Sequence, residues 1–243
     1  MTPHTPPVAN APTEPGRPLT AVLWDFDGTL ADTEPLWIAA EYELVESLGR
    51  RWTLAQAHQL VGKALLDSAA MLLAEIDRTD LEPAWVVQHL LGRVVAKVAS
   101  EPVPWRPGAL ELLAALKADG IPCALVSASY RVLLDAVLAR LPEGSFTASV
   151  AGDEVEHGKP HPESYLRACE LLGVEPAACV VLEDSVPGAE AGNASGAAVV
   201  AIEHVVPVPD APRRHRIASL AEVDVAALAG LQRTGRLETV HAD

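Results

Sequence analysis

Short apolar runs alternate with helix-like segments in the second half of the chain, and this alternation limits the possible folds more than any other feature of the sequence. Strands that alternate with helices of about 10–15 residues are typical of βαβ units, whose strands run parallel. An earlier apolar run ends at Asp25 and needs the same sheet to become buried. We therefore expect strands at residues 20–24, 122–127, 148–152, 179–182 and 197–202. Helices are expected at residues 109–118, 131–140, 163–172 and 189–195.

Residues 34–103 interrupt this alternation with a stretch of helical periodicity. Apolar residues recur there at spacings of three to four, as in Trp37, Ala40, Leu44 and Leu48. A longer helix carries paired valines and leucines between Val86 and Val98, and Pro102 and Pro104 end it. The simplest architecture is an α/β fold with a Rossmann-like parallel sheet. An inserted all-helical domain splits this core after its first strand.

These patterns divide the chain into four parts. We place the α/β core at residues 19–33 and 104–230, the helical insertion at 34–103 and a C-terminal tail at 231–243. Residues 1–18 carry six prolines and no apolar run, so we expect a disordered tail there rather than a signal peptide.

Charge and cysteine content exclude several classes of function. The formal net charge is −15 and the pI is near 4.9, so phosphate backbones and anionic membranes are repelled and neither is an expected partner. No stretch offers about 18 uncharged apolar residues, which a transmembrane helix needs. Cys123, Cys169 and Cys179 lie among apolar neighbours and show neither a disulfide framework nor a zinc spacing. We expect buried thiols and a cytoplasmic protein; the oligomeric state stays open, and a monomer is compatible with the sequence.

Polar residues that follow the expected strands mark a candidate site, because ligands bind beyond the carboxyl ends of the strands in open α/β sheets. Asp25 and Asp27 follow the first strand, Ser127 ends the second, and Glu183 and Asp184 follow a later one. Carboxylate oxygens suit Mg²⁺, and an aspartate can act as a nucleophile toward phosphorus. An ordinary Asp-Gly turn is the alternative for the first pair.

The other candidates also have simpler interpretations when each is taken alone. Ser127 could cap the next helix, and so could Asp184 or Ser185 after their strand. Lys159, in the loop Gly-Lys-Pro, could be an ordinary solvated side chain, or an ammonium aimed at a phosphoryl group.

Taken together, these segments resemble the haloacid dehalogenase-like superfamily, in its phosphatase and β-phosphoglucomutase branch. The resemblance spans roughly residues 19–205 and rests on DFDGTLADTEPLW, LVSAS, GKPHPESY and VLEDSVPG. It implies that Asp25 is the nucleophile and that Asp27 protonates the leaving oxygen and then activates water. It further implies that residues 34–103 form a cap over the site.

The resemblance also implies a ligand set. Mg²⁺ would be held by Asp25, the backbone carbonyl of Asp27 and Asp184, with Glu183 as a further ligand or as a partner of the ligands. Ser127, Ala128 and Lys159 would hold phosphoryl oxygens. Weaker candidates for substrate contact in the cap are Glu34, Trp37 and Lys63.

Departures from the family pattern favour hydrolysis over isomerisation. β-Phosphoglucomutases carry a histidine where Trp37 stands and an arginine near Leu65, where Lys63 is the nearest cation. The mutase Lys-Asn pair after Ser127 is also missing. We therefore expect a Mg²⁺-dependent phosphatase acting on a small phosphorylated metabolite such as a sugar phosphate. A β-phosphoglucomutase-like mutase and a catalytically silent binding module on the same fold are the alternatives.

Overall fold

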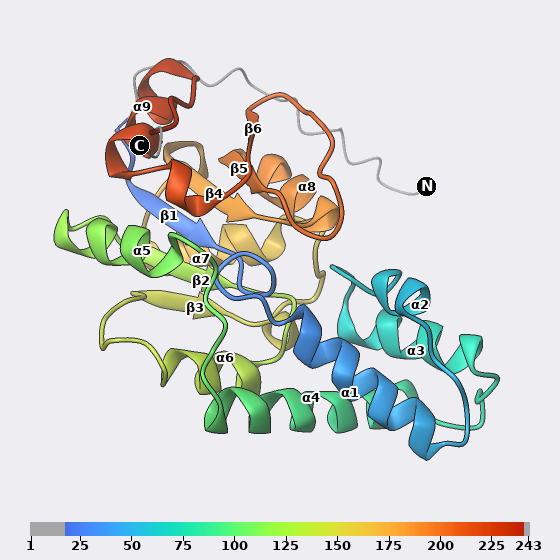
Figure 1. The fold of residues 1–243 in the computed structure, drawn as a ribbon. Helices are drawn as coiled ribbons and strands as arrows, with labels where there is room; N and C mark the ends of the chain where they lie inside the picture. Colours follow the sequence, from blue (N-terminus) through green and yellow to red (C-terminus); the bar gives the residue numbers. More distant parts are fainter. Residues whose placement is uncertain (1–17, 241–243) are drawn as a thin grey trace.

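Within residues 18–240, which the computed structural model describes, six parallel strands form one sheet in the order β3-β2-β1-β4-β5-β6 (Figure 1). Most of the tail expected at residues 1–18, and the last three residues of the chain, lie outside the described residues. The strands are β1 (Ala21–Trp24), β2 (Cys123–Val126), β3 (Ala148–Val150), β4 (Cys179–Glu183), β5 (Ala198–Ile202) and β6 (Arg214–Ile217).

Helices cover both faces of the sheet because successive strand residues point to opposite sides. Val22 and Trp24 pack in one apolar cluster, and Ala21 and Leu23 pack in a second one. The first cluster receives α5 (Ala109–Ala118), α6 (Arg131–Leu138) and α9 (Val225–Thr234). The second receives α7 (Glu163–Leu172) and α8 (Val186–Ala194). Short 3₁₀ turns occur at Gly152–Glu154, Pro176–Ala178 and Leu220–Glu222.

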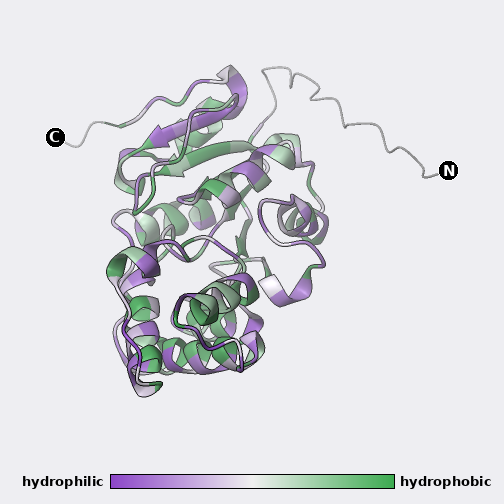
Figure 2. Cartoon of the chain, turned by 90° about the vertical axis from the view of Figure 1, so that its right-hand side faces the viewer, coloured by the Kyte–Doolittle hydropathy of each residue, from purple (hydrophilic) through white to green (hydrophobic). Residues whose placement is uncertain are grey.

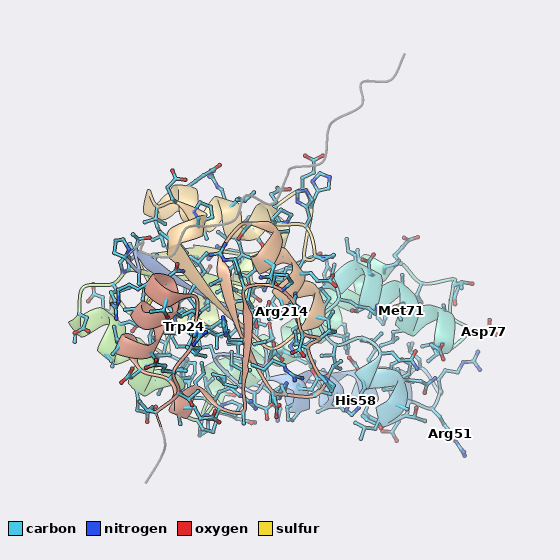
Figure 3. All side chains as sticks on the ribbon, turned by 90° about the horizontal axis from the view of Figure 1, so that it is seen from above. Trp24, Arg51, His58, Met71, Asp77 and Arg214 are labelled. Carbon is cyan, nitrogen blue, oxygen red and sulfur yellow. The ribbon has the colours of Figure 1, made fainter. Side chains whose placement is uncertain are left out.

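Four helices form the insertion between β1 and α5: α1 (Glu34–Ser47), α2 (Leu54–His58), α3 (Leu65–Glu75) and α4 (Pro83–Ser100). They lie to one side of the sheet, as the labelled residues Arg51, His58, Met71 and Asp77 show (Figures 1 and 3). α4 packs against both α1 and α6, so it joins the insertion to the core. None of the described helices is long and apolar enough to cross a membrane.

The structure confirms the parallel sheet, its five expected strands and the inserted helices, but it differs from the expectation at β6, at the start of α8 and at α9. β6 was not expected, because its sequence Arg-His-Arg-Ile has one apolar residue and no strand-like pattern; it lies at the edge of the sheet and is hydrophilic (Figure 2). The helix expected at residues 189–195 begins three residues earlier, at Val186. The Ser185 hydroxyl caps this helix by accepting the Gly188 N–H at 3.1 Å.

The last helix and the three cysteines also bear on the sequence predictions. α9 reaches Thr234 and so includes the first residues of the segment 231–243. Cys123, Cys169 and Cys179 are buried and free. The Sγ atoms of Cys169 and Cys179 lie 3.9 Å apart, a proximity that their separation in sequence does not show.

Candidate active site

A pocket lies between the carboxyl ends of the strands and the helical insertion. The core contributes Asp25, Asp27, Ala128, Lys159 and Asp184 to its lining. The insertion contributes the three weaker candidates as well, Glu34, Trp37 and Lys63. The Gly62 backbone of the insertion lies against Ser185 of the core, where a Cβ would come within 3.1 Å of the Ser185 Cβ. The two parts of the chain therefore enclose the pocket from opposite sides.

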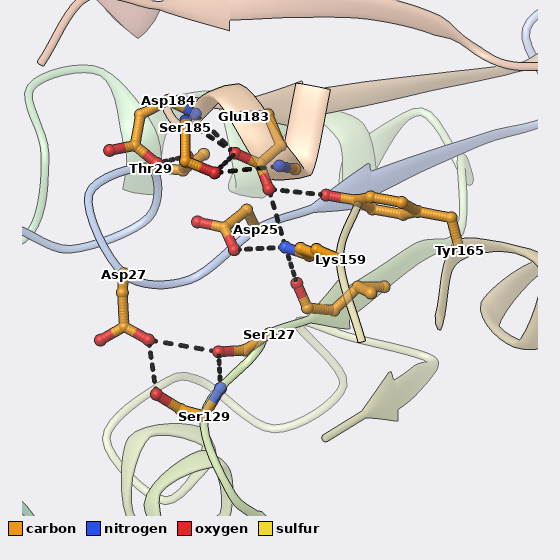
Figure 4. Close-up of polar contacts among 12 residues, drawn as sticks. Asp25, Asp27, Thr29, Ser127, Ser129, Lys159, Tyr165, Glu183, Asp184 and Ser185 are labelled. Atoms are coloured by element: carbon orange, nitrogen blue, oxygen red, sulfur yellow. Dashed lines mark hydrogen bonds and ion pairs between the residues drawn. The ribbon is translucent and has the colours of Figure 1, made fainter. Parts of the chain in front are cut away.

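Lys159 is buried rather than solvated, since 4% of its side chain is exposed. Its Nζ donates to Asp25 Oδ1 at 2.7 Å, to Glu183 Oε1 at 2.7 Å and to the Val126 carbonyl at 3.1 Å (Figure 4). Burial lowers the pKa of the ammonium, but the two carboxylates outweigh this effect and raise the pKa well above 10.5. Lys159 is therefore a fixed positive charge beside Asp25.

Asp25 has one engaged and one free carboxylate oxygen. Oδ1 accepts the hydrogen bond from Lys159, whereas Oδ2 is buried and has no partner among the described residues. Burial and the nearby carboxylates of Glu183 and Asp184 raise the pKa of Asp25 well above 3.8, against the opposing effect of Lys159. A buried acceptor without a partner is costly, so Oδ2 is suited to meet a cation or an electrophile.

The Glu183 carboxylate accepts hydrogen bonds from five donors. Its Oε1 accepts from Lys159 and from the Tyr165 hydroxyl at 3.1 Å. Its Oε2 accepts from the N–H groups of Asp184 and Ser185, both at 2.9 Å, and from the Ser185 hydroxyl at 3.0 Å. Gly188 leaves the necessary space, because a Cβ there would lie 1.5 Å from Glu183 Oε1. Of the two roles open to it, the geometry favours a partner of the site residues over a direct ligand.

Asp27 accepts four hydrogen bonds from side chains. Thr33 and Trp37 donate to Oδ1 at 2.6 and 3.0 Å. Ser127 and Ser129 donate to Oδ2 at 3.2 and 2.8 Å (Figure 4). Ser127 is not the N-cap of the next helix, which begins at Arg131. The second aspartate of the Asp-Gly turn is thus held in one orientation by the core and by the insertion together.

Asp184 completes an acidic cluster with Asp25 and Glu183, in which one ligand atom from each lies within 4.8 Å of the others. The Asp184 Oδ1 accepts from the Thr29 hydroxyl at 3.3 Å. Burial, then the charge of Glu183, raises the pKa of Asp184, while His204 opposes the rise. Gly28, at φ 91°, passes so close that a Cβ would lie 2.0 Å from Asp184 Oδ2. Hard carboxylate oxygens, one of them without a partner, can hold a divalent cation here.

Several residues at the site were not among the sequence candidates. Thr33, Ser129 and Tyr165 donate the hydrogen bonds described above. His204 lines the pocket, with Nδ1 3.2 Å from Asp184 Oδ2 and Nε2 3.2 Å from Asp32 Oδ1. The neighbouring Asp184 carboxylate raises the pKa of His204. β5 ends at Ile202, two residues before His204. Because ligands bind beyond the carboxyl ends of parallel strands, His204 could have been predicted as a site residue.

Comparisons with known proteins agree on one family. A family model described as haloacid dehalogenase-like hydrolase matches residues 19–196. Hexitol phosphatase B of Escherichia coli strain K12 is 34% identical over 220 residues, which cover 88% of this chain and 95% of that protein. Fructose-1-phosphate phosphatase YqaB of the same strain is 30% identical over 178 residues, or 72% and 92% of the two chains. The crystal structure of CbbY from Rhodobacter sphaeroides in complex with phosphate has a TM-score of 0.78 and 29% identity, and the match covers 86% of this chain and 99% of that one.

Proposed function

Because the chain belongs to the haloacid dehalogenase-like hydrolases, we propose that it is a Mg²⁺-dependent phosphatase for small sugar phosphates that works through an aspartyl phosphate. One observation carries this proposal. Asp25, with one oxygen held by Lys159 and the other free, lies in the same pocket as Asp27, which is held by four donors. A nucleophile and a separate acid–base group are what a two-step phosphoryl transfer requires.

In the first step, Asp25 Oδ2 attacks phosphorus while the bond from phosphorus to the substrate oxygen breaks. The leaving oxygen takes a proton from Asp27. In the second step, Asp27 removes a proton from water, which attacks the phosphorus of the aspartyl phosphate and restores the Asp25 carboxylate. Lys159, fixed by Glu183, offsets the negative charge that the carboxylate and the phosphoryl oxygens bring together.

The metal would be held by the carboxylates of Asp25 and Asp184 and by the backbone carbonyl of Asp27. When bound, the cation would lower the repulsion between the anionic carboxylate and the anionic phosphoryl group. Support comes from the acidic cluster of Asp25, Glu183 and Asp184, which has the oxygen donors that Mg²⁺ prefers.

Ser127 and Ala128 would bind the phosphoryl oxygens together with Lys159. Ser127 directly follows β2 and contacts Asp27, and Ala128 lines the pocket. Gly152 allows the chain to pass Ala128 closely, since a Cβ there would lie 2.1 Å from the Ala128 carbonyl oxygen. A side chain at residue 152 would therefore displace this loop.

Residues 34–103 would act as the cap that selects the substrate, with the boundaries that the sequence suggests. Support comes from the insertion residues in the pocket lining and from relatives that are named for hexitol and fructose 1-phosphate hydrolysis. The cap would exclude water during the first step and recognise the sugar.

The purified protein should release phosphate from 4-nitrophenyl phosphate and from members of a sugar-phosphate panel in the presence of Mg²⁺. Chelation should abolish the activity, and renewed Mg²⁺ should restore it. Equal rates with and without chelator would contradict the metal assignment, and the lack of any phosphate release would contradict the phosphatase proposal.

A further inference from the structure

One face of α1 points into the pocket. Glu34, Trp37 and Glu41 are spaced by three and four residues, which places them on one side of a helix, and all three line the pocket. Trp37 donates to Asp27, so this part of the helix lies beside the reacting groups. Glu41 lies about one helical turn farther along α1, roughly 6 Å beyond Trp37.

Glu41 is a buried carboxylate that is only half satisfied. Its residue is 6% exposed. Oε2 accepts a hydrogen bond from the Trp52 indole N–H at 2.9 Å, whereas Oε1 has no hydrogen-bond partner among the described residues. Unlike Asp25 Oδ2, this oxygen is not fully buried, so it stays accessible from the pocket that Glu41 lines. A ligand hydroxyl in the pocket could therefore donate a hydrogen bond to Oε1 while Trp52 keeps Oε2.

The surroundings of Glu41 indicate what kind of group donates. The lining next to α1 is mainly aliphatic, with Ala57, Leu60, Val87 and Leu90. The cationic side chains among the described lining residues are Lys63, Lys159 and His204. Two of these contact the acidic cluster, which leaves Lys63 as the cation that the insertion provides. Two carboxyl groups, Glu34 and Glu41, face one lysine in this part of the pocket, so the wall is unfavourable for a second phosphate.

We propose that Glu41 is a specificity-determining residue whose Oε1 accepts a hydrogen bond from a hydroxyl of an uncharged polyol chain. The substrate class is thus a monophosphorylated sugar or sugar alcohol, and bisphosphates are disfavoured. This inference rests on the proposed phosphatase function and extends it to the end of the substrate that does not react. Burial and the charge of Glu34 raise the pKa of Glu41 to about 7 against the effect of Trp52, so near neutral pH the group can both accept from and donate to a hydroxyl.

The test compares the wild type with Glu41→Leu, Glu41→Gln and the control Glu46→Gln, an exposed position on the same helix. The substrates are sorbitol 6-phosphate, which carries the polyol chain, and 4-nitrophenyl phosphate, which does not. We expect Glu41→Leu to lower kcat/KM for sorbitol 6-phosphate by about 10- to 100-fold, mostly through KM, and to leave the aryl phosphate within about threefold. In Glu41→Gln the single side-chain oxygen can accept from Trp52 while the amide NH₂ donates to the oxygen of the substrate hydroxyl, so this variant should recover most of the loss, and Glu46→Gln should match the wild type.

Two results would overturn the role of Glu41: an equal loss for both substrates in Glu41→Leu, or no loss for sorbitol 6-phosphate. Thermal melting of each variant shows whether a loss of activity comes from unfolding. A loss that comes from unfolding would affect both substrates equally. A wild type that hydrolyses neither substrate would instead contradict the proposed function, so the two failures are distinguishable.

Discussion

The indole N–H of Trp37 donates a hydrogen bond to Oδ1 of Asp27 over 3.0 Å. This bond joins the first helix of the insertion to the Asp-Gly turn of the core. Trp37 also packs against the apolar core, as a helix-face aromatic is expected to do. Its polar edge therefore gives the insertion a direct influence on the proposed acid–base residue, and the position where β-phosphoglucomutases carry histidine retains an N–H donor.

Replacing Trp37 with Phe removes this donor and keeps most of the aromatic volume. Three donors to Asp27 remain, so we expect a loss of about tenfold in kcat for 4-nitrophenyl phosphate, the size of one hydrogen bond to a charged group. Steady-state kinetics measure the effect. Trp85→Phe is the matched control, because Trp85 is 42% exposed on α4 and should be neutral. Equal rates for the two variants would show that the bond to Asp27 is not used.

The two aspartates should differ in the step that they affect. Asp25→Asn removes the nucleophile, so no phosphoenzyme should form. Asp27→Asn keeps the nucleophile and removes the acid and base, which are typically worth ~10²–10⁴-fold. With a good leaving group this variant should become phosphorylated and then hydrolyse slowly. Intact-mass spectrometry after a brief reaction should find a phosphate adduct on Asp27→Asn alone, and an adduct of equal yield on both variants would contradict these roles.

Sequence reasoning found the sheet, the insertion and the acidic turn because each leaves a local pattern. Apolar strands followed by Asp25, Ser127 and Glu183 are visible in the chain, and the rule on strand ends places them at one edge. The edge strand β6 was missed because its Arg-His-Arg sequence follows from its exposed position and not from burial. Local patterns therefore predict the apolar strands, including β3 at the other edge of the sheet, but not the polar strand β6.

Other features depend on contacts between distant segments, which a single sequence does not show. Whether Glu183 ligates a metal or supports Lys159 depends on Tyr165 and on the turn into α8, both of which direct donors at it. Likewise, Trp37 could be assigned to the apolar face of a helix, but its N–H contact with Asp27 requires the relative position of α1 and the turn.

Glu183 and Asp184 should respond differently to metal concentration. Asp184→Asn weakens a proposed ligand, so half-maximal activity should require at least about tenfold more Mg²⁺, in line with the large effect of carboxylate charge on Mg²⁺ sites. Glu183→Gln leaves the proposed ligands intact but disturbs Lys159, so kcat should fall with little change in the Mg²⁺ requirement. Mg²⁺ titrations of 4-nitrophenyl phosphate hydrolysis measure both. A larger shift in the Mg²⁺ requirement for Glu183→Gln would make Glu183 the ligand.

Hydrolysis and isomerisation can be separated at Leu65, which lines the pocket. A mutase needs a cationic grip on the phosphate that is not transferred, and a bidentate arginine provides it best. We expect the wild type to release phosphate from β-glucose 1-phosphate without accumulating glucose 6-phosphate, even with a bisphosphate primer. Phosphorus NMR follows both products. Leu65→Arg should tighten inhibition by glucose 1,6-bisphosphate and barely alter aryl phosphate hydrolysis. If the wild type instead forms glucose 6-phosphate faster than it releases phosphate, the protein is a mutase.

Glu41 should make the folded chain less stable as the pH rises. Burial, mainly, raises its pKa from 4.5 to about 7 in the folded state, so the folded chain binds the proton more tightly than the unfolded chain does. The resulting stability is fully present below about pH 4.5 and is lost as the pH rises through about 7. Glu41→Gln removes this dependence, and its free energy of unfolding relative to the wild type should rise by on the order of 3 kcal/mol between pH 4.5 and pH 8. Urea unfolding at the two pH values measures the difference. The exposed Glu46→Gln control should show no comparable change, and a Glu41→Gln difference independent of pH would mean that Glu41 is ionised in the folded chain throughout this range.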